Sequence, residues 1–121
     1  MDPKSTAAAE QLVRGFATLL TNRRFDQAYM MLEPNAPPRS AFDHEFAGMR
    51  NLHVALGAAG PQEGAAGSSY VSVPLTIAGT SGGKRISRTA TAVVRRVNDV
   101  PGSTEAQRRW HIERIDWSNP V

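Results

Sequence analysis

The chain has 121 residues, which suits one domain that can bury a core without disulfides or bound metal. It contains no cysteine, so disulfides, thiolate metal sites and cysteine nucleophiles are excluded. The formal net charge is +3, but no clustered basic stripe or glycine-rich phosphate loop accompanies it. Nucleic acid is therefore not expected as a partner.

The first predicted helix opens at Asp2 and Pro3 or at Ser5 and Thr6. Short oxygen side chains cap free N–H groups, and proline is tolerated in a first turn. Apolar residues then recur at three- and four-residue spacing, which gives one apolar stripe. This stripe consists of Ala9, Leu12, Val13, Phe16, Leu19 and Leu20.

Two further helices are predicted before residue 50. The second begins at Phe25 and ends before the proline-rich segment 33–38, because prolines stop helices. Its apolar positions are Phe25, Ala28, Tyr29 and Leu32. The third begins at Ser40, where Asp43 resembles the acidic member of a capping box. Its apolar face carries Phe42, Phe46 and Met49.

A strand is predicted directly after Arg50, because apolar and polar positions alternate there. Its apolar positions are Leu52, Val54 and Leu56. The segment 57–67 reads GAAGPQEGAAG and is predicted to be a loop by its composition. A second loop is predicted from Asn98 to Gln107.

The segment from Tyr70 to Val97 predicts one long β-hairpin. A turn at Thr80–Gly83 joins two runs rich in Val, Ile and Thr. If Ser81 pairs with Lys84, one side of the sheet is almost wholly apolar. That side carries Val71, Val73, Leu75, Ile77, Gly79, Ile86, Ala90, Ala92 and Val94, with Arg88 as its one charge. The other side is polar and carries Ser72, Thr76, Ser87, Thr89 and Thr91.

Two irregularities are predicted in the strands. Pro74 has no N–H to donate, so its strand is either an edge at that point or carries a bulge. In a last strand, Arg108–Trp117, the large apolar side chains change parity midway. Trp110 and Ile112 have one parity, and Ile115 and Trp117 have the other. A β-bulge near Glu113 or Arg114 would bring all four to one face.

The predicted class is therefore α+β, with three N-terminal helices packed on a four-stranded antiparallel sheet. The segments that carry a family resemblance are RRFDQAYMML, SAFDHEF, YVSVPLTI and VVRRVNDVPGSTEAQRRWHIERIDW. They are similar to segments of the nuclear transport factor 2-like superfamily, whose members share a cystatin-like α+β fold. Over nearly its whole length the chain most resembles small uncharacterised envelope proteins and lipoproteins of bacteria.

The resemblance implies a single domain over residues 1–121, with a curved sheet that wraps around the helices as a cone with an internal pocket. It also implies export or a lipid anchor upstream, which would make residues 1–5 disordered or foreign to the domain. The protein is then periplasmic or envelope-associated; without an export signal it is cytoplasmic. No run approaches the ~18 apolar residues that span a membrane.

No residue is predicted to be catalytic. His53 has the outward parity of its strand, and Asp43 and His44 lie in a first helical turn. His111 is opposite in parity to Trp110. The three histidines match no metal-ligand spacing, so no metal and no other cofactor are predicted.

The predicted ligand-binding residues are Arg88, Tyr29, Phe46, Ala90, Ala92 and Trp110. Arg88 lies on the apolar side and either reaches water at the rim or anchors an anionic or carbonyl-bearing ligand. The two alanines leave space either for a ligand or for large side chains to pack.

The first functional hypothesis is a non-enzymatic domain that binds a small apolar or anionic ligand or an envelope protein partner. A homodimer through the exposed sheet face accompanies it. The second hypothesis, which the resemblance suggests, is an enzyme like ketosteroid isomerases or polyketide cyclases that acts on a small apolar carbonyl compound. That chemistry needs a base and an oxyanion donor in a dry pocket.

Overall fold

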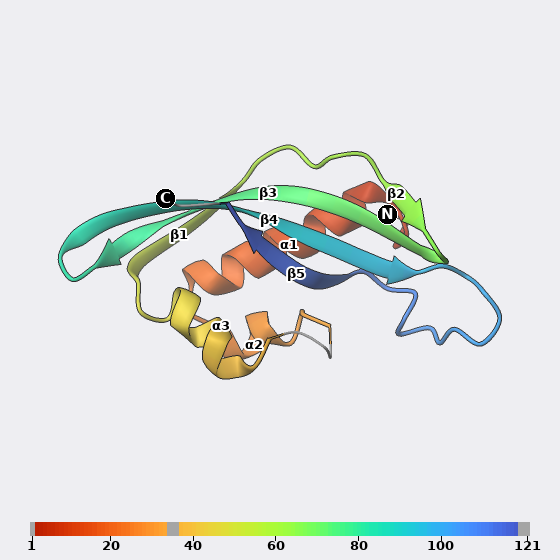
Figure 1. Cartoon of the computed structure of the whole chain (residues 1–121), viewed down its shortest axis with the longest axis horizontal. Helices are drawn as coiled ribbons and strands as arrows, with labels where there is room; N and C mark the ends of the chain where they lie inside the picture. Colours follow the sequence, from red (N-terminus) through yellow and green to blue (C-terminus); the bar gives the residue numbers. More distant parts are fainter. Residues whose placement is uncertain (1, 34–36, 119–121) are drawn as a thin grey trace.

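Five antiparallel strands form one sheet, and three helices precede all of them in the chain (Figure 1). The computed structural model describes residues 2–33 and 37–118. The helices are α1 (Thr6–Thr21), α2 (Phe25–Tyr29) and α3 (Arg39–Phe46). The strands are β1 (Arg50–Leu56), β2 (Glu63–Ala65), β3 (Ser68–Ser81), β4 (Lys84–Val97) and β5 (His111–Trp117). The α+β class is confirmed.

The sheet has the order β1-β3-β4-β5, and β2 pairs with β3 beyond the end of β1. The prediction of four strands was wrong because the 57–67 segment contains β2. Glu63 pairs with Tyr70 across a tight turn in which Ala66 and Gly67 have φ of 47° and 84°. Glycine and alanine have little strand propensity, so the composition of this segment indicated only a loop.

The register of the β3–β4 hairpin is as predicted. Ser81 pairs with Lys84, and Ile77 lies opposite Arg88. Both turn glycines have positive φ, 58° at Gly82 and 80° at Gly83, as the tight hairpin turn requires. The apolar side is buried at Val71, Val73, Leu75, Ile77, Ala90, Ala92 and Val94. Alternation along two strands thus fixed which side faces the core.

Pro74 lies at a local edge of the sheet. β1 ends opposite Leu75, and β2 begins opposite Tyr70, so among the residues that the structure describes no strand pairs with β3 at Pro74 on that side. The Pro74 carbonyl accepts a hydrogen bond from the Gly57 N–H at 2.8 Å. Because a strand residue points its N–H and C=O to the same side, the missing donor faces the gap between β1 and β2. The edge alternative is the correct one.

The bulge in β5 is also as predicted. Val93 pairs with Arg114 but Val94 pairs with Ile112, so Glu113 is the inserted residue. The insertion puts Ile115 and Trp117 on the same side as Ile112, where they pack against the core. One extra residue therefore keeps the apolar side chains of β5 on a single face.

Two details of the helices differ from the predictions. α2 ends at Tyr29, and Leu32 instead forms an isolated bridge with Ile112 at the free edge of β5. The capping box at Ser40 is absent: α3 begins at Arg39 without a side-chain cap. Asp43 pairs with Arg39 at 2.8 Å, because a guanidinium one turn away competes for the carboxylate.

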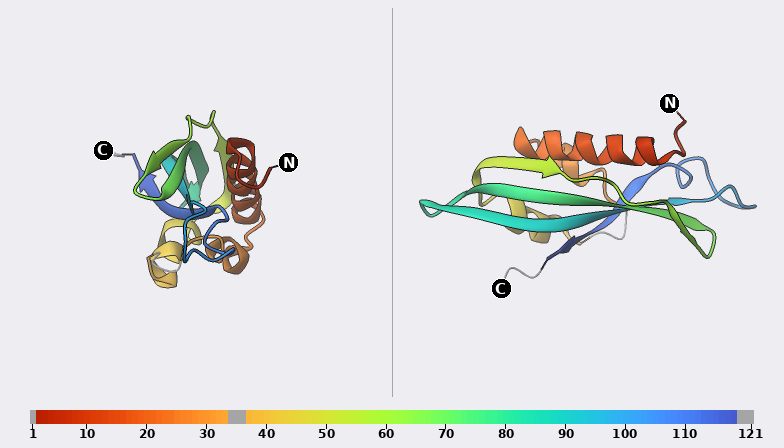
Figure 2. Two further views of the ribbon diagram at one scale, coloured as in Figure 1. Left: turned by 90° about the vertical axis from the view of Figure 1, so that its right-hand side faces the viewer. Right: turned by 90° about the horizontal axis from the view of Figure 1, so that it is seen from above.

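The core lies between the helices and the inner side of the sheet. Ser5 caps α1, which buries Ala9, Val13, Phe16, Ala17 and Leu20. Figure 2 shows α1 running along the middle of the sheet, with α2 and α3 beside its C-terminal half. Arg23 joins these parts, since its guanidinium donates to the carbonyls of Ala47 and Met49. The structure thereby places α3 beside the inner face of β5.

Candidate functional site

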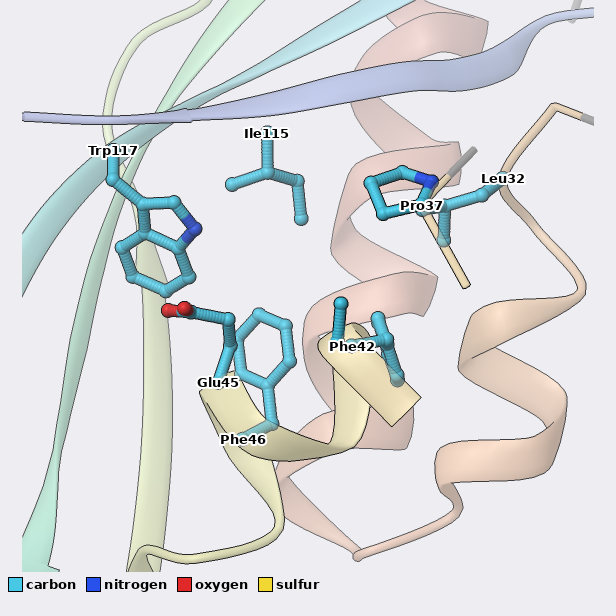
Figure 3. A pocket seen from close by; sticks show the side chains of 8 residues that line it. Leu32, Pro37, Phe42, Glu45, Phe46, Ile115 and Trp117 are labelled. Carbon is cyan, nitrogen blue, oxygen red and sulfur yellow. The ribbon is translucent and has the colours of Figure 1, made fainter. Parts of the chain in front are cut away.

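An apolar cleft separates α3 from the second half of β5 (Figure 3). On α3, residues three and four positions apart share a helical face, so Ala41, Phe42, Glu45 and Phe46 all border the cleft. The bulge of β5 turns Ile115 and Trp117 toward them. Leu32 and Pro37 close one end. These residues enclose a volume of about 220 Å³.

Aromatic side chains form the floor of the cleft. The ring centroid of Phe46 lies 5.0 Å from that of Phe42 and 5.6 Å from that of Trp117. Phe16 of α1 meets both phenylalanines edge-on from below. Phe46 is only 2% exposed, so the floor belongs to the core. The cleft is therefore shallow, and the space beneath it is filled by side chains.

One ion pair stands at the rim of the cleft. Arg88 Nη1 lies 2.8 Å from Glu45 Oε2, and its guanidinium carbon lies 4.0 Å from the centroid of the Trp117 ring. The Arg88 and Glu45 side chains are 27% and 32% exposed. The charge on the apolar side of the hairpin thus has a carboxylate and an aromatic face as partners. Partial solvation makes the pair worth about 1 kcal/mol or less to stability.

A second, more polar hollow adjoins the cleft at Glu45. It lies between the C-terminal end of α3 and the tip of the hairpin and has a volume of about 380 Å³. Its lining residues are His44, Glu45, Gly48, Met49, Ser81, Ile86 and Arg88. Glu45 lines both spaces, so the Arg88–Glu45 pair divides an apolar compartment from a polar one.

The structure brings together only two of the six predicted ligand-binding residues. Phe46 lines the cleft, and Arg88 stands at its rim. Tyr29 packs on Phe42 from outside the cleft and donates its hydroxyl to the Pro37 carbonyl. The remaining three do not line the cleft.

Ala90 and Ala92 are buried in the core cluster at 3% and 0% exposure. Their small size serves the packing of the large core side chains. Trp110 belongs to the other end of α1, where its indole N–H donates to the Ser5 carbonyl at 3.1 Å. Arg96 covers the ring of Trp110 at 5.4 Å. Ala90, Ala92 and Trp110 therefore contribute to packing and do not line the cleft.

The titratable residues discussed in the sequence lie away from the cleft floor. His53 and His44 are exposed, and His111 Nδ1 lies 3.0 Å from the Arg109 carbonyl. Within residues 2–33 and 37–118, no three His, Asp or Glu side chains cluster as a metal site would need. In the same residues, no helix is long and apolar enough to span a membrane.

Another ion pair stabilises the outer face rather than the cleft. Arg95 donates to both carboxylate oxygens of Glu33 and to the Ser68 hydroxyl. Partial burial lowers the pKa of Arg95, but the charge of Glu33 and its hydrogen bonds outweigh that effect and raise it. This pair ties the segment after α2 to β4 across β5.

Glu45 and Trp117 are the functional candidates that the sequence did not reveal. Glu45 lies next to Phe46 on the predicted third helix, and Trp117 faces inward as soon as the bulge is assumed. The unexplained charge of Arg88 was the available signal, since a half-buried cation requires a nearby carboxylate. The sequence offered several carboxylates, and only the tertiary packing selects Glu45.

Comparison with models of known protein families gave no match, and comparison with curated protein sequences gave none either. The superfamily resemblance remains a prediction. The function is therefore inferred from the cleft and its rim.

Proposed function

We propose that the protein is a non-enzymatic binding domain of the nuclear transport factor 2-like type, which holds a small, mainly apolar ligand between α3 and β5. One observation carries this proposal: of the described residues that line the cleft, all except Glu45 are apolar or aromatic. Ligand sites usually combine such a lining with few polar groups that fix orientation. A volume of about 220 Å³ is below the ~300 Å³ of a typical site, so the ligand is one ring or a short acyl chain.

The rim favours a ligand that ends in a carboxylate. Of the guanidinium nitrogens of Arg88, only Nη1 donates a hydrogen bond within the described residues. The other donors can bind a second anion while the ring of Trp117 supports the guanidinium from one face. The proposed ligand class is therefore a short aliphatic or aromatic carboxylic acid, with its apolar part in the cleft.

The enzymatic alternative, an isomerase or cyclase acting on a carbonyl compound, has one feature in its favour. Glu45 is a carboxylate beside an apolar cleft, where a general base would stand. Its Oε2 is held by Arg88, and among the described side chains that line the cleft only Trp117 offers an N–H or O–H donor, its Nε1. An isomerase or cyclase needs a free base and donors for an oxyanion, and these two groups supply less than that. Binding is therefore the better-supported function.

The homodimer remains a separate proposal. The outer face of the hairpin, through which dimerisation was predicted, is exposed and polar at Ser72, Thr76, Ser87 and Thr89. Such a surface favours a wet, weak contact over an obligate interface.

Ligand-induced stabilisation tests the proposed function. Octanoate and phenylacetate should raise the melting temperature, and the matched alcohols should raise it less because they lack the charge for Arg88. At one hundred times the dissociation constant, a ligand adds about 2.7 kcal/mol of stability. Replacing the exposed Ala41 by Phe fills the cleft from its wall and should abolish the shift without disturbing the core.

Ala7→Phe is the matched control, because Ala7 is also an exposed helical alanine but belongs to α1. This variant should keep the full ligand-induced shift. If acids and alcohols leave the melting temperature of the unmodified protein unchanged, or if Ala41→Phe responds like Ala7→Phe, the cleft is not the binding site.

A further inference from the structure

Part of β4 is an open edge of the sheet. β5 pairs with β4 only from Ala90 to Arg95, and the Ser118 N–H still donates to the Thr89 carbonyl at 2.9 Å. Within the described residues, no strand lies beside Lys84–Arg88 on that side. Figure 1 shows this end of the hairpin projecting beyond β5 and α3. A sheet edge of this kind is a template for another strand.

The backbone groups that face outward can be identified. The N–H and C=O groups of successive strand residues point alternately to the two sides. The Thr89 carbonyl points toward β5, because it accepts the hydrogen bond from Ser118. Arg85 and Ser87 therefore present their N–H and C=O groups on the same open side. An added strand would continue the line of β5 along these groups.

Basic side chains lie at the tip of the hairpin: Lys84 and Arg85 on β4 beside the open edge, and Arg50 on β1 across β3. Within the described residues, no carboxylate lies within ion-pair distance of Arg50, Lys84 or Arg85. Arg50 and Arg85 flank Thr80 from the two neighbouring strands. The arginines that do have carboxylate partners are Arg39, Arg88, Arg95, Arg108, Arg109 and Arg114. Three cations without an ion-pair partner within the described residues therefore lie at the hairpin tip, and the other five, Lys4, Arg14, Arg23, Arg24 and Arg96, lie elsewhere.

We propose that the open edge of β4 binds an extended acidic segment of another protein as an added antiparallel or parallel strand. The backbone N–H and C=O groups of Arg85 and Ser87 form hydrogen bonds with the added strand. The side chains of Lys84 and Arg85 at the hairpin tip favour a strand with acidic residues. A second copy of this chain does not suit the site, because pairing two such edges would bring two sets of Lys84 and Arg85 together. The polar hollow that contains Ile86 and Met49 adjoins the edge and can receive a side chain of the partner.

The direct test uses a fluorescent peptide of about six residues, the usual strand length, that alternates Glu and Val. Its binding to the full chain is followed by fluorescence anisotropy at low and high salt. The acidic peptide should bind, its affinity should fall as salt screens the basic tip, and a Lys and Val peptide should not bind. A version with N-methyl groups on the backbone nitrogens of one edge should bind at least about tenfold more weakly, because it cannot complete the ladder.

Two substitutions at Ser87 separate the ladder from the surface charge. Ser87→Pro removes an N–H that faces the open edge, and proline is tolerated at such positions. It should weaken acidic peptide binding about tenfold, whereas Ser87→Val, which keeps the N–H, should not.

If Ser87→Pro does not fold, the N-methylated peptide carries the test with the protein unchanged. Equal binding of the N-methylated and parent peptides would mean charge attraction alone and would overturn the proposal. Binding of the basic peptide, or no binding of the acidic one, would overturn it as well.

Discussion

Deleting Glu113 should cost about 3–5 kcal/mol of the free energy of unfolding, since it removes the bulge that keeps β5 in phase with the core. Without the inserted residue, either Ile112 or the pair Ile115 and Trp117 must turn outward. A buried apolar side chain contributes about 1.5–3 kcal/mol. This loss is a large fraction of the ~5–15 kcal/mol that typically stabilises a domain. Urea denaturation followed by circular dichroism measures it.

Glu113→Ala is the matched control, because it removes the carboxylate and keeps the inserted backbone. Glu113 Oε2 lies 3.3 Å from Arg114 Nη1 but makes no hydrogen bond within the described residues. Its loss should change stability by about 1 kcal/mol at most. Equal destabilisation by the deletion and the substitution would show that the bulge does not set the phase of β5.

Replacing Phe46 by Ala should destabilise the protein by about 3–5 kcal/mol. Phe46 is the central side chain of the cleft floor and contacts Phe16, Phe42 and Trp117. Its removal leaves a cavity below the cleft that the surrounding helices and sheet cannot fully close. The loss is measured as the change in the denaturation midpoint at constant m-value.

Phe25→Ala is the comparison for this prediction. Phe25 is half-buried on α2 and stacks with Arg23, so its truncation should cost less than half as much. Small aromatic compounds should restore part of the stability of Phe46→Ala and none of that of Phe25→Ala, since only the former has an apolar cavity. Similar losses in the two variants would contradict the placement of Phe46 at the centre of the packing.

The sheet could be predicted because its pattern has a period of two and covers two long strands. The turn glycines fixed the pairing of Ser81 with Lys84, and every further pair in the hairpin followed. The parity change between Ile112 and Ile115 required an inserted residue, which the structure places at Glu113. These predictions succeeded because a one-residue error would have exposed a whole row of apolar side chains.

The errors occurred where short-range patterns compete with tertiary contacts. β2 has three residues and no strand-favouring side chain, and it exists because β3 offers it a partner. Leu32 continues the helical spacing of Phe25 and Tyr29, but the helix ends at Tyr29. Leu32 instead forms a bridge with Ile112 at the edge of β5. Asp43 fits a capping pattern and is nevertheless taken by Arg39.

The candidate site was only partly predictable. The register placed Arg88 on the inner side of the hairpin between Ile86 and Ala90, and its position at the rim follows from that pairing. The carboxylate that pairs with Arg88 is Glu45, and this choice depends on how α3 packs against the sheet. No local sequence pattern encodes that packing. Ala90 and Ala92 were predicted to leave space either for a ligand or for large side chains, and both alanines are buried in the core cluster. The cleft instead lies between α3 and β5, where Phe46 and Trp117 line it.

The fluorescence of Trp117 tests the central claim most directly, because the chain has two tryptophans and only this one lines the cleft. In a Trp110→Phe variant, titration with octanoate should change the Trp117 emission along a saturable curve. In a Trp117→Phe variant, the emission of Trp110, which is buried against the start of α1, should stay constant. The same response from both tryptophans, or an unchanged Trp117 emission, would contradict ligand binding between α3 and β5.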